Sequence, residues 1–218
     1  MITIHGVLRS RASRNIWLLE EMGTPYRHVP VIQAYRLPDP AAPDAPLNTR
    51  SPAFLALNPN GRIPAMEEDG LVLNESLAIN LYLAKRHGGD LGPRDAAEDG
   101  EMTAWTLWAV TEAEPHAIQV LYNRVGNPTA PKDPARADAA VAALRAPFAV
   151  LDAALAKDGF VVGGRFTVAD VNLAEVFRYA QPAPELFEAA PRVKDWLARV
   201  QARPAFRRMW ALRDAEPA

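Results

Sequence analysis

The hydrophobic pattern changes in kind at a polar, glycine-rich break over residues 88–100, and this change constrains the fold more than any other feature. Before the break, short apolar runs typical of strands alternate with runs of helical spacing. After it, the spacing is almost entirely helical. A mixed half followed by a helical half predicts two domains joined by a linker. We place these parts at residues 1–87, 88–100 and 101–218.

The first half has the order strand, helix, strand, then a long loop, then two strands and a helix. Gly23 and Pro25 directly follow the first helix and are typical of a helix end. Five prolines from Pro38 to Pro52 follow no period and indicate the long loop. We expect strands at residues 2–4, 26–32, 63–66 and 71–73, and helices at residues 14–22 and 76–86.

The second half carries helical signals only. Thr167 and Asp170 have the spacing of a capping-box variant that begins a helix. Pro115 predicts a kink within its helix, because proline lacks the backbone N–H. We expect helices at residues 98–125, 136–157, 167–179, 193–200 and 204–212.

Composition excludes several classes of protein. The formal net charge is −2 at pH 7, so no positive field favours a nucleic-acid partner. The chain has no cysteine, which excludes disulfides, thiolate metal sites and a cysteine nucleophile. No uninterrupted apolar stretch reaches the roughly 18 residues of a membrane span, and the N-terminus lacks a signal-peptide pattern. We therefore expect a cytoplasmic protein without a nucleic-acid, membrane or metal partner.

Four short segments stand out: NPNGRIP at residues 58–64, NES at 74–76, FTVAD at 166–170 and RPAF at 203–206. With these segments the chain resembles the cytosolic glutathione transferases of bacterial serine type. Their order matches that family, and the resemblance covers nearly the whole chain. It implies an α/β thioredoxin-like N-terminal domain that binds glutathione, and an all-α C-terminal domain that binds the acceptor and forms a homodimer. It also implies glutathione as co-substrate and no metal.

The resemblance implies a set of glutathione-binding residues, each with a purely structural alternative. The backbone of Ile63, before a cis Pro64, would pair with the cysteinyl backbone. The alternative for Pro64 is an ordinary edge-strand proline. Ser76, at a helix N-terminus that suits a carboxylate, would bind the γ-glutamyl carboxylate and Glu75 the ammonium group, with helix capping as the alternative. Arg62 would reach the glycyl carboxylate or lie on the surface.

The catalytic residue is expected between the first strand and the first helix. In serine-type members the active serine precedes an arginine of that helix by four residues, which identifies Ser10 before Arg14. Ser13 is the second candidate, with helix capping as its alternative. The nucleophile is the glutathione thiolate, and a thiol with a pKa of about 8.5 is mostly protonated at neutral pH. A hydroxyl that donates to the sulfur stabilises the thiolate by about 1.5–3 kcal/mol.

Trp105 and Trp108 lie on one face of the helix expected at residues 98–125. The resemblance implies that this helix lines an acceptor pocket, together with Leu8 and Arg9 of the loop that carries the serines. The alternative is that both indoles belong to the core.

We interpret the chain as a glutathione transferase that conjugates reduced glutathione to small hydrophobic electrophiles through a serine-stabilised thiolate, a detoxification reaction. Two alternatives stay open. One is a glutathione-fold protein that serves as a scaffold or binding partner. The other is a different glutathione-dependent enzyme, such as a disulfide reductase, a peroxidase or an isomerase. The absence of cysteine argues against a reductase that uses its own thiol. Pocket shape sets the acceptor, so the sequence leaves its identity open.

Overall fold

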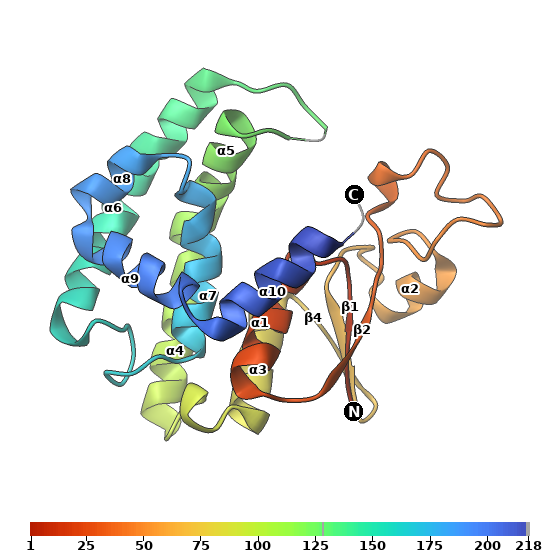
Figure 1. Cartoon of the computed structure of the whole chain (residues 1–218), viewed down its shortest axis with the longest axis horizontal. Coiled ribbons are helices and arrows are strands. Elements are labelled where there is room, and N and C mark those ends of the chain that lie inside the picture. Colours follow the sequence, from red (N-terminus) through yellow and green to blue (C-terminus); the bar gives the residue numbers. More distant parts are fainter. Residues whose placement is uncertain (128, 217–218) are drawn as a thin grey trace. The chain divides into compact units, whose positions relative to one another are not determined.

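A computed structural model describes residues 1–127 and 129–216 (Figure 1). The chain folds into two compact units: Met1–Gly89 together with Pro204–Ala218, and Asp90–Arg203. The first unit therefore contains the last helix, which the sequence analysis placed in the helical domain.

A four-stranded mixed sheet forms the centre of the first unit. β1 is parallel to β2 and antiparallel to β3, and β3 and β4 form an antiparallel hairpin. The spatial order is β2-β1-β3-β4, which confirms the expected thioredoxin-like fold. The strands are β1 (Ile2–His5), β2 (Tyr26–Val29), β3 (Ala65–Glu68) and β4 (Leu71–Asn74). β3 begins directly after Pro64 rather than at residue 63, because proline has no N–H to donate to a sheet.

Two helices cover one face of this sheet (Figure 1). α1 (Ala12–Met22) and α3 (Ser76–His87) pack against each other and against the strands. The sheet face beneath them carries Ile4 and Met66, both fully buried. α1 ends as expected, since Gly23 adopts a left-handed φ of 62° that suits a residue without a Cβ.

A short helix that the sequence analysis missed covers the opposite face. α2 (Pro52–Leu57) follows the proline-rich loop, and its Phe54 packs in a cluster with Val31 and Ala65. Proline is tolerated at the start of a helix because an N–H there has no intrahelical partner. A helix of 6 residues is too short to show a helical period in the sequence.

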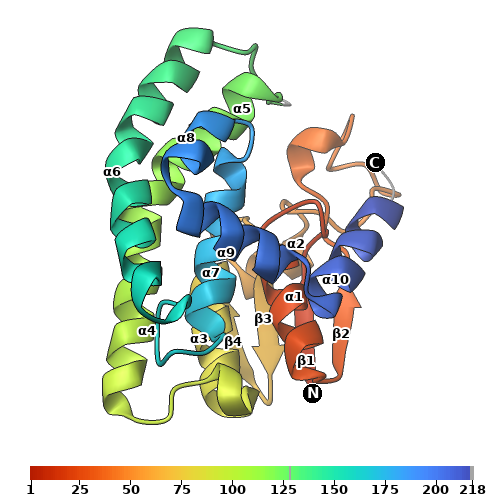
Figure 2. The same cartoon turned by 60° about the vertical axis from the view of Figure 1, so that its left-hand side comes forward.

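The last helix, α10 (Pro204–Ala215), packs along α1 (Figures 1 and 2). The Phe206 ring meets the Trp17 indole edge-on at a centroid distance of 4.9 Å. Nearby, Arg208 Nε donates to Glu20 Oε2 at 2.9 Å. These contacts attach the chain end to the first unit.

The second unit consists of helices and the turns between them. Its helices are α4 (Ala96–Trp108), α5 (Glu114–Arg124), α6 (Pro134–Asp158), α7 (Val168–Phe177), α8 (Pro184–Ala189) and α9 (Pro191–Gln201). The short α8 was not expected, and a single 3₁₀ turn, Arg178–Ala180, ends the helix that we expected to run to residue 179.

The helix expected over residues 98–125 is interrupted before Pro115. A π-helical turn, Ala109–Ala113, separates α4 from α5. Pro115 cannot donate to the carbonyl group four residues earlier, and its ring crowds that group, so the hydrogen-bond ladder breaks here. The expected kink takes the form of this turn.

By length and composition alone, α6 is long and apolar enough to cross a membrane. Its buried residues, however, form a stripe at helical spacing that packs against α5 and α9. The stripe includes Leu144, Phe148, Leu151 and Leu155. We interpret α6 as a core helix of the second unit.

α4 begins inside the linker expected at residues 88–100. The Asp95 carboxylate accepts hydrogen bonds from the backbone N–H groups of Ala97 and Glu98 at 2.9 Å each, and this caps the helix. The segment between α3 and α4 therefore spans residues 88–95, which is shorter than the linker expected at residues 88–100.

Arg165 holds this segment on the second unit through four hydrogen bonds. Its guanidinium donates to both carboxylate oxygens of Glu98 at 2.7 Å. It also donates to the backbone oxygens of Asp90 at 3.0 Å and Gly92 at 2.9 Å. Hydrogen bonding to Arg165 lowers the pKa of Glu98 to about 2.

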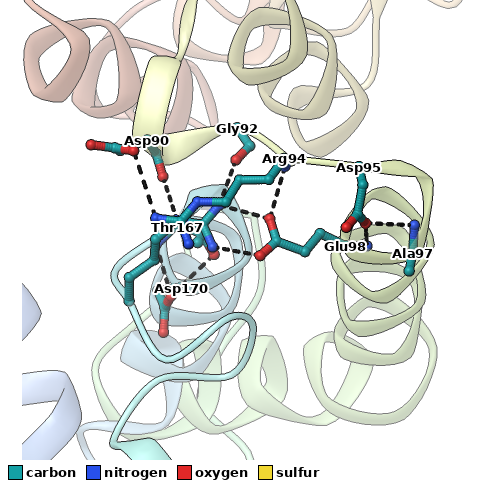
Figure 3. Close-up of polar contacts among 9 residues, drawn as sticks. Asp90, Gly92, Arg94, Asp95, Ala97, Glu98, Thr167 and Asp170 are labelled. Atoms are coloured by element: carbon teal, nitrogen blue, oxygen red, sulfur yellow. Dashed lines mark hydrogen bonds and ion pairs between the residues drawn. The ribbon is translucent and has the colours of Figure 1, made fainter.

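Thr167 and Asp170 form the capping box expected at the start of α7 (Figure 3). The Thr167 N–H donates to Asp170 Oδ2 at 2.9 Å, and the Trp196 indole N–H donates to Asp170 Oδ1 at 3.0 Å. Burial raises the pKa of Asp170 to about 6. The box thus anchors α7 to α9 as well as beginning the helix.

Candidate functional site

The N-terminus of α3 forms one part of the candidate site. Ser76 is the first residue of this helix and is buried, and the Glu75 carbonyl oxygen accepts from the Ile79 N–H at 2.9 Å. Glu75 has a φ of 69°, a conformation that costs a residue other than glycine about 1–3 kcal/mol. Its side chain is exposed. The N–H groups of a first helical turn and the helix dipole favour a carboxylate at such a position.

A buried polar network beneath Ser76 fixes this helix end. The Arg14 guanidinium donates to the Ser76 hydroxyl oxygen at 3.2 Å, and the Asn15 amide donates to the Ser76 carbonyl oxygen at 2.7 Å. Asn15 also donates to Asn80 Oδ1 at 2.7 Å, and Asn80 donates to the Arg14 carbonyl oxygen at 3.3 Å. All four residues are buried. α1 therefore sets the position of the first turn of α3 and brings a positive charge to it.

In the sequence, Arg14 serves only to locate a serine, and neither Asn15 nor Asn80 is predicted as a site residue. The available signal was a polar residue beside buried apolar neighbours in each helix, such as Asn80 next to Ile79. A buried amide needs hydrogen-bond partners, so this pattern indicates a network between helices.

The NPNGRIP segment places Ile63 and Pro64 directly before β3. The Ile63–Pro64 peptide bond is cis, as the resemblance implies. The Asn58 side chain donates to the Arg62 carbonyl oxygen at 2.6 Å, and Gly61, with a φ of 59°, allows the tight turn between them. Pro64 is buried, Ile63 is half-buried and the Arg62 side chain is exposed.

Ser10 lies in the loop between β1 and α1, whereas Ser13 lies in the first turn of α1, so the two candidate serines have different environments. Ser10 is half-buried; its hydroxyl donates to the Val7 carbonyl oxygen at 2.6 Å and accepts from the Ala12 N–H at 3.1 Å. Ser13 is fully buried in α1, and its hydroxyl donates to the Ser10 carbonyl oxygen at 3.0 Å. Ser10 therefore has the more accessible hydroxyl.

Leu8 and Arg9, which we expected near the acceptor, precede Ser10 in this loop. Leu8 is buried and Arg9 is half-buried. The Arg9 side chain lies against the end of α10, where its Nε donates to the Arg213 carbonyl oxygen at 3.4 Å.

Trp105 and Trp108 lie on α4 in the second unit and are both half-buried. Their rings meet edge-to-face at a centroid distance of 5.1 Å. Trp108 also stacks on Phe177 at 6.1 Å, and Phe177 belongs to the buried core. One ring face of Trp108 thus contributes to the core. This agrees in part with the alternative that both indoles belong to the core.

Among the described residues, no group of three His, Cys, Asp or Glu side chains is arranged to hold a metal ion. What the first unit offers instead is a helix N-terminus over a buried arginine, a half-buried hydroxyl and the backbone beside a cis proline. These groups are suited to binding a small polar molecule with a carboxylate.

Comparisons with known proteins find similar sequences and structures. Two family models match: Glutathione S-transferase, N-terminal domain, at residues 10–86, and Glutathione S-transferase, C-terminal domain, at residues 113–204. Glutathione S-transferase GstB of Escherichia coli (strain K12) is 30% identical over 213 residues, covering 96% of this chain and 97% of the relative. Glutathione S-transferase 3 of Zea mays is 34% identical over 170 residues, covering 73% of this chain and 75% of the relative. The solved theta class glutathione S-transferase of Xanthomonas axonopodis pv. citri with glutathione bound is 31% identical, with a TM-score of 0.78 and 95% of each chain covered.

Proposed function

Because this chain belongs to the glutathione S-transferase family, and is thus a transferase with glutathione as its co-substrate, we propose that Ser10 stabilises the glutathione thiolate for attack on a small hydrophobic electrophile. The family matches favour an enzyme over the scaffold alternative.

The observation that supports Ser10 is the contrast in burial between the two candidate serines. Ser13 is 0% exposed, so its hydroxyl is closed to a bound sulfur, whereas the Ser10 side chain is only half-buried. The Ser10 hydroxyl now donates to the Val7 carbonyl oxygen. A thiolate is a charged and hence stronger acceptor, so we expect the hydroxyl to rotate toward it. The Ala12 N–H donates to Ser10 Oγ, and this hydrogen bond polarises the hydroxyl so that it becomes a stronger donor to the thiolate.

A hydroxyl suffices for this chemistry without a general base. Lowering the thiol pKa by two units from about 8.5 requires about 2.7 kcal/mol. A hydrogen bond to the charged sulfur supplies about 1.5–3 kcal/mol. The N-terminus of α1, which begins two residues after Ser10, adds about 0.3–1 kcal/mol.

The proposed binding residues match the polar groups of glutathione one by one. The γ-glutamyl carboxylate lies at Ser76, supported by the positive charge of the buried Arg14. The exposed side chain of Glu75 pairs with the ammonium group. The backbone of Ile63 pairs with the cysteinyl residue, and the exposed Arg62 pairs with the glycyl carboxylate.

The reaction proceeds by nucleophilic attack. The thiol proton passes to solvent when the thiolate forms. The sulfur then bonds to the electrophilic carbon, and in a substitution the leaving group departs with the electron pair of the broken bond. For the electrophile we propose the residues that the family resemblance implies, which are Leu8, Arg9, Trp105 and Trp108.

We also propose a cytoplasmic homodimer with two-fold symmetry, without nucleic-acid or membrane partners. Two-fold dimers are the commonest assembly among soluble oligomers. Leu107 is 58% exposed and Val110 38% exposed, and an interface would cover such apolar side chains. Light scattering should give twice the 23.8 kDa mass of the chain, and a value equal to one chain would exclude the dimer.

The deciding experiment compares Ser10→Ala with Ser13→Ala. Thiolate absorbance of bound glutathione, titrated against pH, reports the thiol pKa, and calorimetry reports affinity. We expect Ser10→Ala to raise the thiol pKa by about one to two units, the equivalent of one lost charge-assisted hydrogen bond, with affinity nearly unchanged. A larger effect of Ser13→Ala would show that the other serine contacts the thiolate.

A further inference from the structure

The residue that follows α10 contacts the loop that carries Ser10. Glu216 follows α10, and its carboxylate accepts hydrogen bonds from two consecutive backbone N–H groups: Oε1 from Leu8 at 2.8 Å and Oε2 from Arg9 at 3.0 Å. Glu216 is half-buried. Hydrogen bonds to a carboxylate are charge-assisted and roughly twice as strong as those between neutral groups.

The loop holds the chain end in return. Arg9 Nε donates to the Arg213 carbonyl oxygen at 3.4 Å, and Arg9 Nη2 donates to the Asp214 carbonyl oxygen at 3.5 Å. Basic side chains near a helix C-terminus stabilise its last carbonyl groups in this way. Two segments separated by 207 positions in sequence are therefore linked in both directions.

These contacts lie inside the turn that positions the Ser10 hydroxyl. Leu8 and Arg9 are the two residues between Val7, whose carbonyl oxygen accepts from that hydroxyl, and Ser10 itself. Fixing both N–H groups fixes the peptide planes of the turn, and these planes set the direction in which the Ser10 side chain leaves the backbone.

Docking of α10 depends on other residues. The helix packs on α1 through Phe206 against Trp17 and through Arg208 to Glu20. These contacts lie more than two helical turns before Glu216. Loss of the Glu216 carboxylate should therefore release the Leu8 and Arg9 N–H groups while the helix stays in place.

We propose that Glu216 is a positioning residue for Ser10, which acts through the N–H groups of Leu8 and Arg9. This inference rests on the proposed function of Ser10. A negative charge by itself disfavours a thiolate nearby. Glu216 therefore favours the reaction through its two acceptor oxygens, which hold the Leu8 and Arg9 N–H groups, and not through its charge.

Three variants of the full chain separate these properties. Glu216→Ala removes both acceptors, and Glu216→Gln removes the charge but keeps one acceptor oxygen. Asp214→Ala is the matched control, because it removes an exposed negative charge two residues away and keeps the carbonyl group that Arg9 binds. The assay couples glutathione to 1-chloro-2,4-dinitrobenzene, an aromatic chloride from which chloride departs.

We expect Glu216→Ala to lower kcat about tenfold, the equivalent of about one charge-assisted hydrogen bond, and Glu216→Gln to lower it about threefold. The KM for glutathione and the melting temperature should stay near those of the wild type, and Asp214→Ala should match the wild type throughout. Without glutathione, amide hydrogen exchange at Leu8 and Arg9 should be at least about fivefold faster in Glu216→Ala, because the two N–H groups lose their acceptors.

Four results would overturn the inference: an unchanged or higher kcat in Glu216→Ala, equal losses in the Ala and Gln variants, a fall of kcat in parallel with the melting temperature, or unchanged exchange at both amides. Failure of the proposed function has a different signature. The wild-type chain would then neither bind glutathione nor form the conjugate, while the exchange rates would still report the contact between Glu216 and the loop.

Discussion

The Arg14 guanidinium donates to the hydroxyl oxygen of Ser76 at 3.2 Å, and both side chains are buried. This contact joins α1 to α3. Ser10 lies just before α1, and Ser76 is held from the first turn of the same helix. One helix therefore supports both the position proposed for the thiol and the position proposed for the γ-glutamyl carboxylate.

Replacement of Arg14 by methionine tests this role. Arg14→Met keeps an unbranched but shorter side chain, and it removes the donor to Ser76 and the buried positive charge. We expect the Kd for glutathione to rise at least about tenfold, because a charge-assisted hydrogen bond is worth about 1.5–3 kcal/mol. Calorimetry measures the Kd. Arg207→Met is the control, since Arg207 lies exposed on α10. A Kd within twofold of the wild type would show that Arg14 does not contribute to glutathione binding.

The γ-glutamyl end of glutathione is tested by the double variant Glu75→Ala and Ser76→Ala. We expect it to weaken glutathione binding more than about tenfold, since two polar contacts are lost. Cysteinylglycine lacks the γ-glutamyl group, so its affinity for the wild type and the variant should be equal. A double variant that loses affinity equally for both ligands would contradict the assignment, and so would one that binds glutathione normally.

The two tryptophans of α4 should differ in their effect on stability. Trp108 stacks on the buried Phe177, whereas Trp105 meets Trp108 edge-to-face. We expect Trp108→Ala to lower the free energy of unfolding by about 2–3 kcal/mol, less than for a fully buried ring, and Trp105→Ala to lower it by less. Denaturant unfolding measures both.

The same variants test the acceptor site. A ring contact of roughly 60 Å² is worth about 1.5 kcal/mol, so we expect the KM of an aromatic electrophile to rise about tenfold in Trp108→Ala with the KM of glutathione unchanged. Loss of stability with an unchanged electrophile KM would assign Trp108 to the core alone.

The ion pair between Arg165 and Glu98 predicts a pH dependence of stability. Its hydrogen bonds lower the pKa of Glu98 from 4.5 to about 2 in the folded chain. A lowered pKa stabilises the folded state above the unfolded value, and this stabilisation is lost as the pH falls from about 4.5 toward 2. The melting temperature of Glu98→Gln should lie below that of the wild type at pH 7, and the gap should narrow below pH 4.5.

Glu101→Gln is the control for this measurement, because Glu101 lies exposed on the same helix. Its melting temperature should follow the wild type from pH 7 to pH 3. A gap for Glu98→Gln that stays constant over the whole pH range would contradict the lowered pKa of Glu98.

Local chemistry made much of this fold predictable from the sequence. The strand and helix order of the first unit, the helix end at Gly23, the capping box of Thr167 and Asp170 and the interruption near Pro115 all follow from residues close in sequence. Hydrophobic periods and caps act over one or two turns, so a single chain displays them. The six-residue helices α2 and α8 were missed because they are shorter than two helical turns.

Other features of this protein became visible only in the tertiary structure, because they depend on contacts between segments that are distant in sequence. A helical period shows that α10 has an apolar face but not which unit that face packs against, and Phe206 against Trp17 settled it. The spacing of Ser10 and Ser13 was visible in the sequence, while only the structure showed that Ser13 is fully buried and Ser10 half-buried. The contacts of Arg14 with Ser76 and of Glu216 with the serine loop join residues far apart in sequence, and only folding brings such partners within hydrogen-bond distance.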